Sequence, residues 1–216
     1  QIRICAGDLW DFRPLRGKAS EDEKRESMQD DFDAGVEWFN RFKPHYFLRG
    51  NHDERLWECA ESGSPRADLA QILIHGGRLA GVSVEGLMRR HKCSMLPYHK
   101  RDGVLRLGSL KVIHGFNSGV YATRQHALIY GSVLHGHTHT IDEHAIPGIE
   151  RRVARSIGCL CKLDMDYNAR SVNTLRYANG WAYGVVDDKS GDFKVWQAEG
   201  VNGKFVVGGE PRVIAA

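Results

Sequence analysis

The chain has 216 residues, of which 42% are hydrophobic and 26% are charged, and its formal net charge is +3 at pH 7. That length suits one domain with at most a small insertion, and the hydrophobic share is enough for a packed core. The weak positive charge does not by itself indicate a nucleic-acid-binding protein, and no apolar run is long enough to span a membrane.

The N-terminal part of the chain predicts a β-α-β unit. Residues 2–6 form a short apolar strand, and a basic loop follows over residues 12–19. Ser20 and the acidic residues after it have the pattern of a capped helix start, and the helix is expected to run to Phe42, just before Pro44. Residues 45–48 form the next strand. These two strands are therefore expected to be parallel, with a right-handed crossover.

Short helices are expected between the second strand and residue 97, over residues 55–60, 66–74 and 84–90. The same stretch and the residues just after it are rich in basic side chains: Arg66, Arg89, Arg90, His91, Lys92, His99, Lys100 and Arg101. Two interpretations are open. The basic residues form either a solvated charged face or a lip that attracts a substrate phosphate.

The C-terminal part is richer in strands. Residues 104–113 predict a hairpin with a Gly-Ser turn, residues 121–129 a helix, and residues 132–135 a further strand. Strands are then expected over residues 151–157, 181–186, 193–197 and 205–207. We expect these last strands to form a second sheet that packs on the first.

Four short motifs follow apolar strands in chain order: Gly7-Asp8, Gly50-Asn51-His52-Asp53, His114-Gly115 and Gly136-His137-Thr138-His139. Together they offer a carboxylate, an amide oxygen and several imidazoles. Such mixed donors suit Mn, Fe, Zn or Ni better than Ca, which prefers oxygen ligands. The glycines permit tight turns and a close backbone approach to a metal ion. Because ligand sites of open α/β sheets gather at the carboxyl ends of strands, the motifs predict a metal centre there.

These motifs resemble those of the calcineurin-like metallophosphoesterases, over about residues 1–160. The resemblance implies an α/β fold, a four-layer αββα sandwich of two mixed β-sheets. It implies a single domain over residues 1–216, with residues 54–103 as a substrate-side insertion and residues 146–216 as strands of the second sheet. The run Gly-Asn-His-Asp-Glu-Arg is similar to the nuclease-like and phage-type branches of the family.

The resemblance also implies a role for each motif residue at two divalent metal ions, expected to be Mn, with Fe, Zn or Ni as alternatives. Asp8 would bridge the two ions. Asn51, His114 and His137 would complete the ligands of one ion, and His139 would bind the other. His52 would face the substrate as the general acid, with Asp53 orienting it.

The expected activity is hydrolysis of a phosphoester, with a metal-bridging hydroxide as the nucleophile. A phosphodiester, such as a nucleotide or nucleic acid, is favoured. The alternatives are a phosphomonoesterase, or a catalytically impaired metal-binding scaffold or interaction protein. The last alternative arises because the family's Asp-x-His motif does not precede Asp8. We expect the natural protein to extend upstream and supply it, and Asp142-Glu143-His144 is not expected to replace it.

Other residues have less defined roles. Arg55 either contacts a substrate phosphate or covers the helix start, and Asp11 either supports the metal site or caps a turn. His126 and His135 are expected to be structural. The five cysteines, including Cys159-Leu-Cys161, are expected to be reduced thiols of a cytoplasmic protein and not a zinc knuckle, because the C-x-C has no second pair. The oligomeric state stays open.

Overall fold

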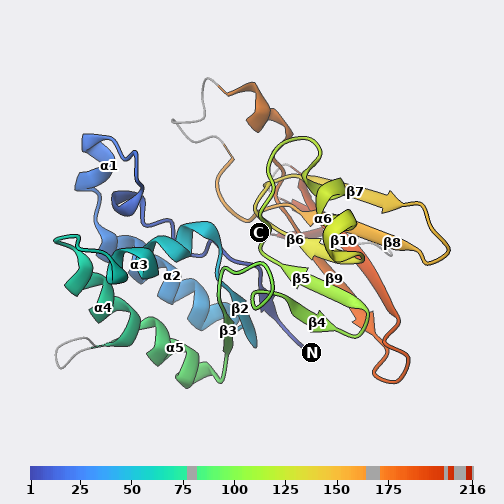
Figure 1. Cartoon of the computed structure of the whole chain (residues 1–216), viewed down its shortest axis with the longest axis horizontal. Helices are drawn as coiled ribbons and strands as arrows, with labels where there is room; N and C mark the ends of the chain where they lie inside the picture. Colours follow the sequence, from blue (N-terminus) through green and yellow to red (C-terminus); the bar gives the residue numbers. More distant parts are fainter. Residues whose placement is uncertain (77–81, 164–170, 202–203, 207–212, 216) are drawn as a thin grey trace. The chain divides into compact units, whose positions relative to one another are not determined.

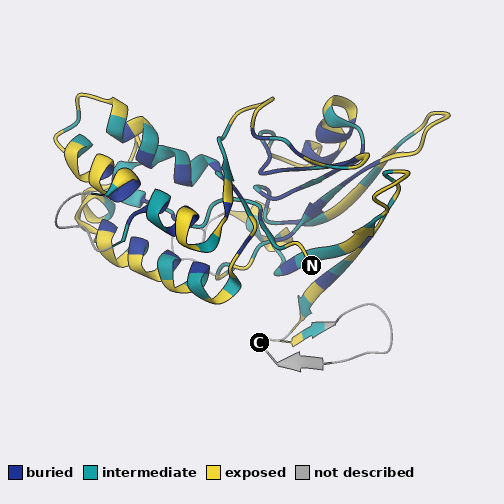
Figure 2. Cartoon of the chain, turned by 90° about the horizontal axis from the view of Figure 1, so that it is seen from below, coloured by how far each residue is buried: buried dark blue, intermediate teal, exposed yellow. Residues whose placement is uncertain are grey.

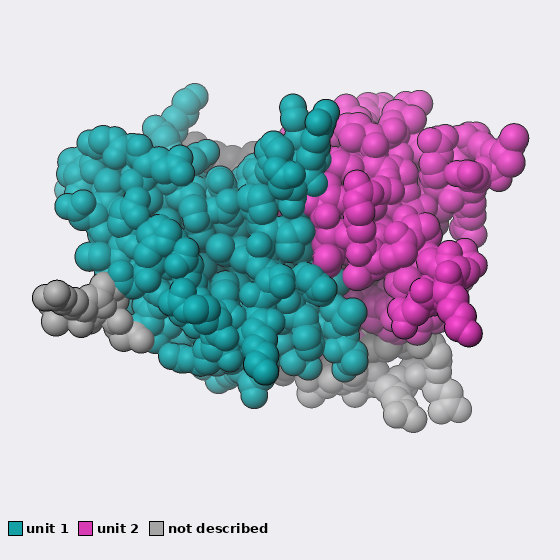
Figure 3. Space-filling view, turned by 60° about the horizontal axis from the view of Figure 1, so that its bottom comes forward, with its two compact units in different colours: residues 1–103 teal, residues 104–216 magenta. Residues whose placement is uncertain are grey.

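The computed structural model describes residues 1–76, 82–163, 171–201, 204–206 and 213–215. The chain forms two compact units, residues 1–103 (unit 1) and residues 104–216 (unit 2), which are coloured separately in Figure 3. Both combine helices with strands, so the predicted α/β class is confirmed, whereas the prediction of one domain stays a prediction.

Unit 1 contains a three-stranded parallel sheet (Figure 1). Its central strand is β2 (Tyr46–Leu48), which pairs with β1 (Ile4–Cys5) on one side and with β3 (Ser94–Leu96) on the other. The predicted parallel pairing of the first two strands is therefore confirmed. Strand β3 was not predicted, because three residues are too few to show a period and their partner lies far away in sequence.

Five helices of unit 1 are described: α1 (Glu21–Arg25), α2 (Met28–Phe42), α3 (Asn51–Glu61), α4 (Ala67–His75) and α5 (Val84–His91). The prediction of one continuous helix up to Phe42 was wrong. Ser20 does cap a helix, but Glu26 is extended and Ser27 caps a second helix by accepting from the backbone N–H of Asp30 at 3.1 Å. The second capping serine therefore sets the break.

An aromatic cluster fills the core of unit 1. Trp10 is fully buried, stacks on Phe32 with ring centroids 5.6 Å apart, and meets Phe47 edge-on at the same distance. Its indole N–H donates to the carbonyl of Phe32 at 3.1 Å. Gly35 of α2 lets the ring approach, because a Cβ there would overlap the indole. Trp10 thus anchors the loop after β1 to the core. Helices α2, α3, α4 and α5 each carry both buried and exposed residues (Figure 2).

Unit 2 contains a five-stranded mixed sheet in the order β4-β5-β6-β8-β7. Its strands are β4 (Leu105–Leu107), β5 (Leu110–Ile113), β6 (Val133–His135), β7 (Ile141–Ile146) and β8 (Arg152–Ile157). The predicted hairpin is confirmed, since β4 and β5 are antiparallel. Strands β5, β6 and β8 are parallel to one another, and α6 (Ala122–Tyr130) connects β5 to β6.

A second sheet of unit 2 is an antiparallel meander of β9 (Gly180–Val186), β10 (Phe193–Val201), β11 (Lys204–Val206) and β12 (Val213–Ala215). The predicted strand over residues 151–157 does not belong to it, because β8 pairs with β6. One tie between the two sheets is the side-chain amide of Gln197, which donates to the carbonyl of Ser156 at 3.0 Å. Val207, the predicted last strand residue, lies outside the described residues.

Within the described part of the chain, none of the helices combines the length and apolarity that crossing a bilayer requires.

Candidate functional site

The loop after β1 places Asp8 at the start of α3. Gly7 and Asp8 both have positive φ, 98° and 55°, so the chain turns sharply off the strand. Glycine adopts such a φ easily, whereas an aspartate does so only when other contacts hold it. Those contacts are hydrogen bonds: the Asp8 N–H donates to Asp53 at 2.7 Å, and the Asp8 carboxylate accepts from the backbone N–H of His52 at 2.9 Å.

Asp53 is the buried tie between the two motif loops of unit 1. Its carboxylate has no exposed surface and accepts the backbone N–H groups of Asp8, Trp10 and Gly50 at 2.7, 2.9 and 2.8 Å. A buried carboxylate is tolerated only when its oxygens are satisfied in this way. Asp53 therefore fixes the loop after β1 against the first turn of α3.

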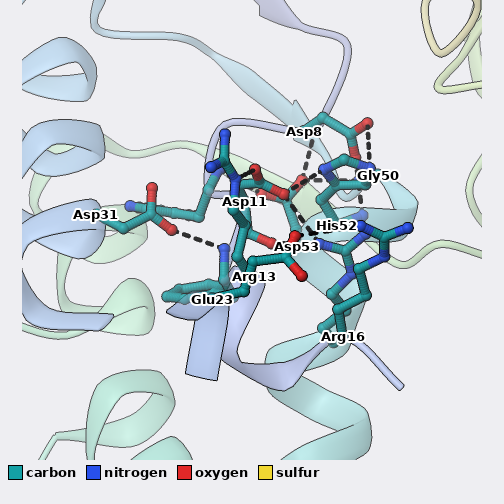
Figure 4. Close-up of polar contacts among 12 residues, drawn as sticks. Asp8, Asp11, Arg13, Arg16, Glu23, Asp31, Gly50, His52 and Asp53 are labelled. Atoms are coloured by element: carbon teal, nitrogen blue, oxygen red, sulfur yellow. Dashed lines mark hydrogen bonds and ion pairs between the residues drawn. The ribbon is translucent and has the colours of Figure 1, made fainter. Parts of the chain in front are cut away.

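His52 lies in the first turn of α3 and is partly exposed (Figure 4). Its Nδ1 is 2.8 Å from Oδ1 of Asp11, and its Nε2 is 4.0 Å from Oδ2 of Asp8. Because a carboxylate only accepts, Nδ1 carries the proton that it shares with Asp11. The orienting contact that the sequence predicted for Asp53 is thus seen with Asp11.

The carboxylate of Asp11 contacts two arginines as well as His52. Besides the imidazole, it accepts from Nε of Arg13 at 2.8 Å and from Nη1 of Arg55 at 2.9 Å. Burial disfavours its charge, but the hydrogen bonds from His52 and Arg13, with the charges of His52 and Arg55, outweigh that and hold the pKa of Asp11 well below its ordinary range. Of the two interpretations of Asp11, support of the site is therefore favoured.

The structure also bears on Arg55. Its guanidinium donates to both the side chain and the carbonyl of Asp11, at 2.9 and 2.6 Å, and its side chain is 16% exposed. Arg55 therefore holds the loop that contains Asp11. This favours the interpretation that Arg55 covers the helix start over the interpretation that it contacts a substrate phosphate.

The structure also places Asn51 and the basic residues of unit 1. Asn51 is the first residue of α3 and is half-buried. Arg66 of the basic stretch donates to the carbonyls of Pro14 and Lys24, both at 2.8 Å, and so supports the loop and helix before α2. Arg90 and Arg101 are exposed.

In unit 2, His114 and His137 follow the neighbouring parallel strands β5 and β6. His114 is 3% exposed, and its ring centroid lies 5.2 Å from that of His137. Gly115, at φ 118°, makes room for this approach, since a Cβ there would come within 3.0 Å of the His137 Cβ. The structure therefore brings two of the predicted metal ligands together.

The His137-Thr138-His139 segment is a strongly turned loop. His137 and His139 have positive φ, 66° and 58°, as the predicted turn after Gly136 requires. Buried Thr138 between them anchors the loop, because its hydroxyl lies 2.6 Å from that of Ser156 in β8. Ser156 in turn donates to the carbonyl of Thr140 at 2.6 Å.

His126 and His135 are fully buried, which confirms their predicted structural role. Nε2 of His126 accepts the backbone N–H groups of Phe116 and Asn117 at 3.0 and 3.3 Å, so its proton is on Nδ1. Burial, reinforced by the neighbouring histidines, lowers the pKa of His126 to about 3, and burial lowers the pKa of His135 to about 4. Their rings lie 4.2 Å apart, so this neutral pair supports the loops that follow β5 and β6.

His139 also lies close to two cysteines, a proximity that the sequence did not predict. The thiols of Cys159 and Cys161 offer ligand atoms within 4.8 Å of one another and of a ring nitrogen of His139. The C-x-C spacing was the only sequence signal. Asp142-Glu143-His144, in contrast, lies in β7, paired with β8.

A scan against models of known protein families finds no match for this chain, and a search of curated proteins finds none either. The resemblance to the metallophosphoesterases therefore stays a prediction.

Proposed function

We propose that the chain is a metal-dependent phosphoester hydrolase that acts on phosphodiesters such as nucleotides or nucleic acid. The observation that carries the proposal is the convergence of His114 and His137 from the carboxyl ends of two neighbouring parallel strands. Neighbouring imidazoles at strand ends are a metal-binding arrangement. We also propose that the chain adopts the four-layer αββα sandwich that the resemblance implies.

The donor set fits two divalent ions such as Mn. Asp8, Asn51, His114, His137 and His139 would hold them, as the resemblance implies. The donors are one carboxylate, one neutral amide oxygen and three imidazoles, a mixture that first-row transition metals accept. When bound, such ions neutralise phosphoryl charge and lower the pKa of bound water.

His52 is the general acid in this proposal. Its Nδ1–H is held by Asp11 at 2.8 Å, which fixes the orientation of the ring. Nε2 is then the nitrogen that can give a proton to the leaving oxygen of the substrate. Asp11 is a positioning residue in this assignment, and Arg13 and Arg55 keep its carboxylate ionised.

A second candidate is a metal-binding scaffold without catalysis. It is favoured by the position of Asp142-Glu143-His144, because these residues lie in β7, paired with β8, and Asp142 is exposed. A phosphomonoesterase is the other alternative. Activity on the two ester classes separates all three.

The test is Mn-dependent hydrolysis of bis-p-nitrophenyl phosphate, a diester, compared with p-nitrophenyl phosphate, a monoester. We expect diester hydrolysis that a chelator abolishes. His52→Ala should keep its bound Mn and lower kcat by about 100-fold, the scale of a lost general acid. The matched control is His75→Ala, which removes an exposed imidazole of the same unit. Metal binding without hydrolysis of either ester would leave the scaffold candidate, and loss of Mn from His52→Ala would contradict the role of His52.

A further inference from the structure

Three segments of unit 2 lie side by side around His139. The backbone N–H of Ala178 donates to the carbonyl of His139 at 2.9 Å, and the N–H of Cys159 donates to the carbonyl of Ala178 at 3.0 Å. Cys159 in turn accepts from the N–H of Gly180 at 2.9 Å. The segment over residues 177–180 therefore links the His139 loop to the Cys159 loop.

A glycine makes this close approach feasible. Gly158 has φ 78°, and a Cβ there would come within 2.8 Å of the carbonyl oxygen of Ala178. The ring of Tyr177 also meets the His139 ring edge-on, with the ring centroids 5.0 Å apart. Both contacts place His139 and Cys159 by packing as well as by hydrogen bonds.

The result is a cluster of soft ligands. Both sulfur atoms and a ring nitrogen of His139 lie within 4.8 Å of one another, and all three residues are half-buried. Neither cysteine forms a disulfide in the structure. Two thiolates and one imidazole are ligands of Zn²⁺, and three protein ligands leave the fourth tetrahedral position open to water.

Asn179 supports the cysteine loop from outside the cluster. Its side-chain amide donates to the carbonyls of Cys161 and Cys159 at 2.8 and 3.3 Å and lies 3.9 Å from Sγ of Cys159. Hydrogen bonds, the strongest from Cys161, lower the pKa of the Cys159 thiol to about 7 although burial opposes this.

We propose that His139, Cys159 and Cys161 form a Zn²⁺-binding site of unit 2. The site goes beyond the proposed function and needs no residue of unit 1. The two proposals share only His139, and Asp8→Asn separates them, because it removes the bridging carboxylate but no ligand of the Zn²⁺ site. The failure of one proposal is therefore distinguishable from the failure of the other.

The probe is Co²⁺, which takes Zn²⁺ sites and shows a near-ultraviolet sulfur-to-cobalt charge-transfer band when thiolates bind it. The whole chain is kept reduced under anaerobic conditions, and a thiol titration counts its cysteines. We expect the band to saturate at about one Co²⁺ per chain and to disappear when Zn²⁺ is added. Cys159→Ser and Cys161→Ser should each remove roughly half of it, and the double variant all of it. Asn179→Ala should weaken Co²⁺ binding by about 10-fold.

Two variants serve as controls. Cys93→Ala removes a buried thiol of unit 1, and Asp8→Asn removes the carboxylate of the proposed hydrolytic centre. Both should keep the full band, and far-ultraviolet circular dichroism verifies the fold of each variant. The proposal is overturned if the reduced chain shows no band, if the band survives in the double cysteine variant, or if the thiol count shows a Cys159–Cys161 disulfide under these conditions.

Discussion

The two units hold their candidate functional residues in opposite ways. In unit 1 the groups that fix the site are charged: Asp53 accepts three backbone N–H groups, and Asp11 accepts from His52, Arg13 and Arg55. In unit 2 they are neutral, since His126 and His135 are buried imidazoles. The difference shows that site loops can be fixed either by satisfied charges or by burial that keeps a titratable group uncharged.

The two strategies predict different responses to acid. Because the pKa of Asp11 is below its ordinary range, its stabilising contribution is present at neutral pH and is lost only in strong acid. Folding lowers the pKa of His126 from 6.5 to about 3. Between these two pH values the imidazole is protonated in the unfolded chain but not in the folded chain, so the free energy of unfolding decreases as the pH falls. Stability from unit 2 should therefore fall first as the pH decreases.

The largest expected effect comes from Asp53→Ala in unit 1. It leaves the buried N–H groups of Trp10 and Gly50 and the part-buried N–H of Asp8 without their acceptor, and we expect the free energy of unfolding to fall by about 3 to 5 kcal/mol. Urea unfolding followed by tryptophan fluorescence measures this. Asp33→Asn, an exposed aspartate of α2, is the control and should change stability by less than about 0.5 kcal/mol. Equal effects of the two variants would contradict the role of Asp53.

The next effect concerns the neutral histidines of unit 2. Lowering the pH from 7 to 5 should cost about 1 to 2 kcal/mol through His126, and His126→Gln should remove that dependence. Hydrogen exchange of the Phe116 and Asn117 amides, which donate to His126, reports it locally. His144→Gln of β7 is the control. An unchanged pH dependence in His126→Gln would show that other groups cause it.

A smaller effect is expected for the positioning residue of unit 1. Asp11→Asn should lower kcat by about 10-fold, less than loss of His52 itself, because the imidazole loses the carboxylate that orients it. Asp11→Glu should restore part of the activity. A fall in kcat that Asp11→Glu does not reverse would mean that Asp11 only supports the fold.

The smallest effect tests the helix break. Ser27→Ala removes the cap of α2 and should cost about 1 kcal/mol, whereas Ser20→Ala, at the five-residue helix α1, should cost less. Thermal unfolding of the two variants gives the comparison. A larger loss for Ser20→Ala would contradict the assignment of Ser27 as the stronger cap.

Sequence reasoning reached the parts of the fold that depend on local pattern. The strands before Asp8, Asn51, His114 and His137 and the glycines between strand and motif are local features, and the structure has them. It missed β3, and it assigned the 151–157 strand to the wrong sheet, because strand pairing is a tertiary property.

The contacts that sequence reasoning missed have the same cause. Asp11 contacts His52 from a loop in which Asp8 and Phe12 have left-handed backbone conformations. The residue types of this loop do not predict that combination of conformations. Cys159 and Cys161 approach His139 through hydrogen bonds to residues 177–180, which are remote in sequence. The chemistry of each residue could be predicted, but its neighbours could not.

The most direct test of the proposed hydrolytic centre is the Mn content of the purified chain, measured by mass spectrometry after loading and removal of free metal. Mn is chosen because thiolates such as Cys159 and Cys161 bind it weakly. We predict about two Mn²⁺ per chain for the native sequence, as the resemblance implies, and loss of most of both in Asp8→Asn. His137→Ala should lose about one. Equal Mn content in the native chain and Asp8→Asn would contradict the central claim.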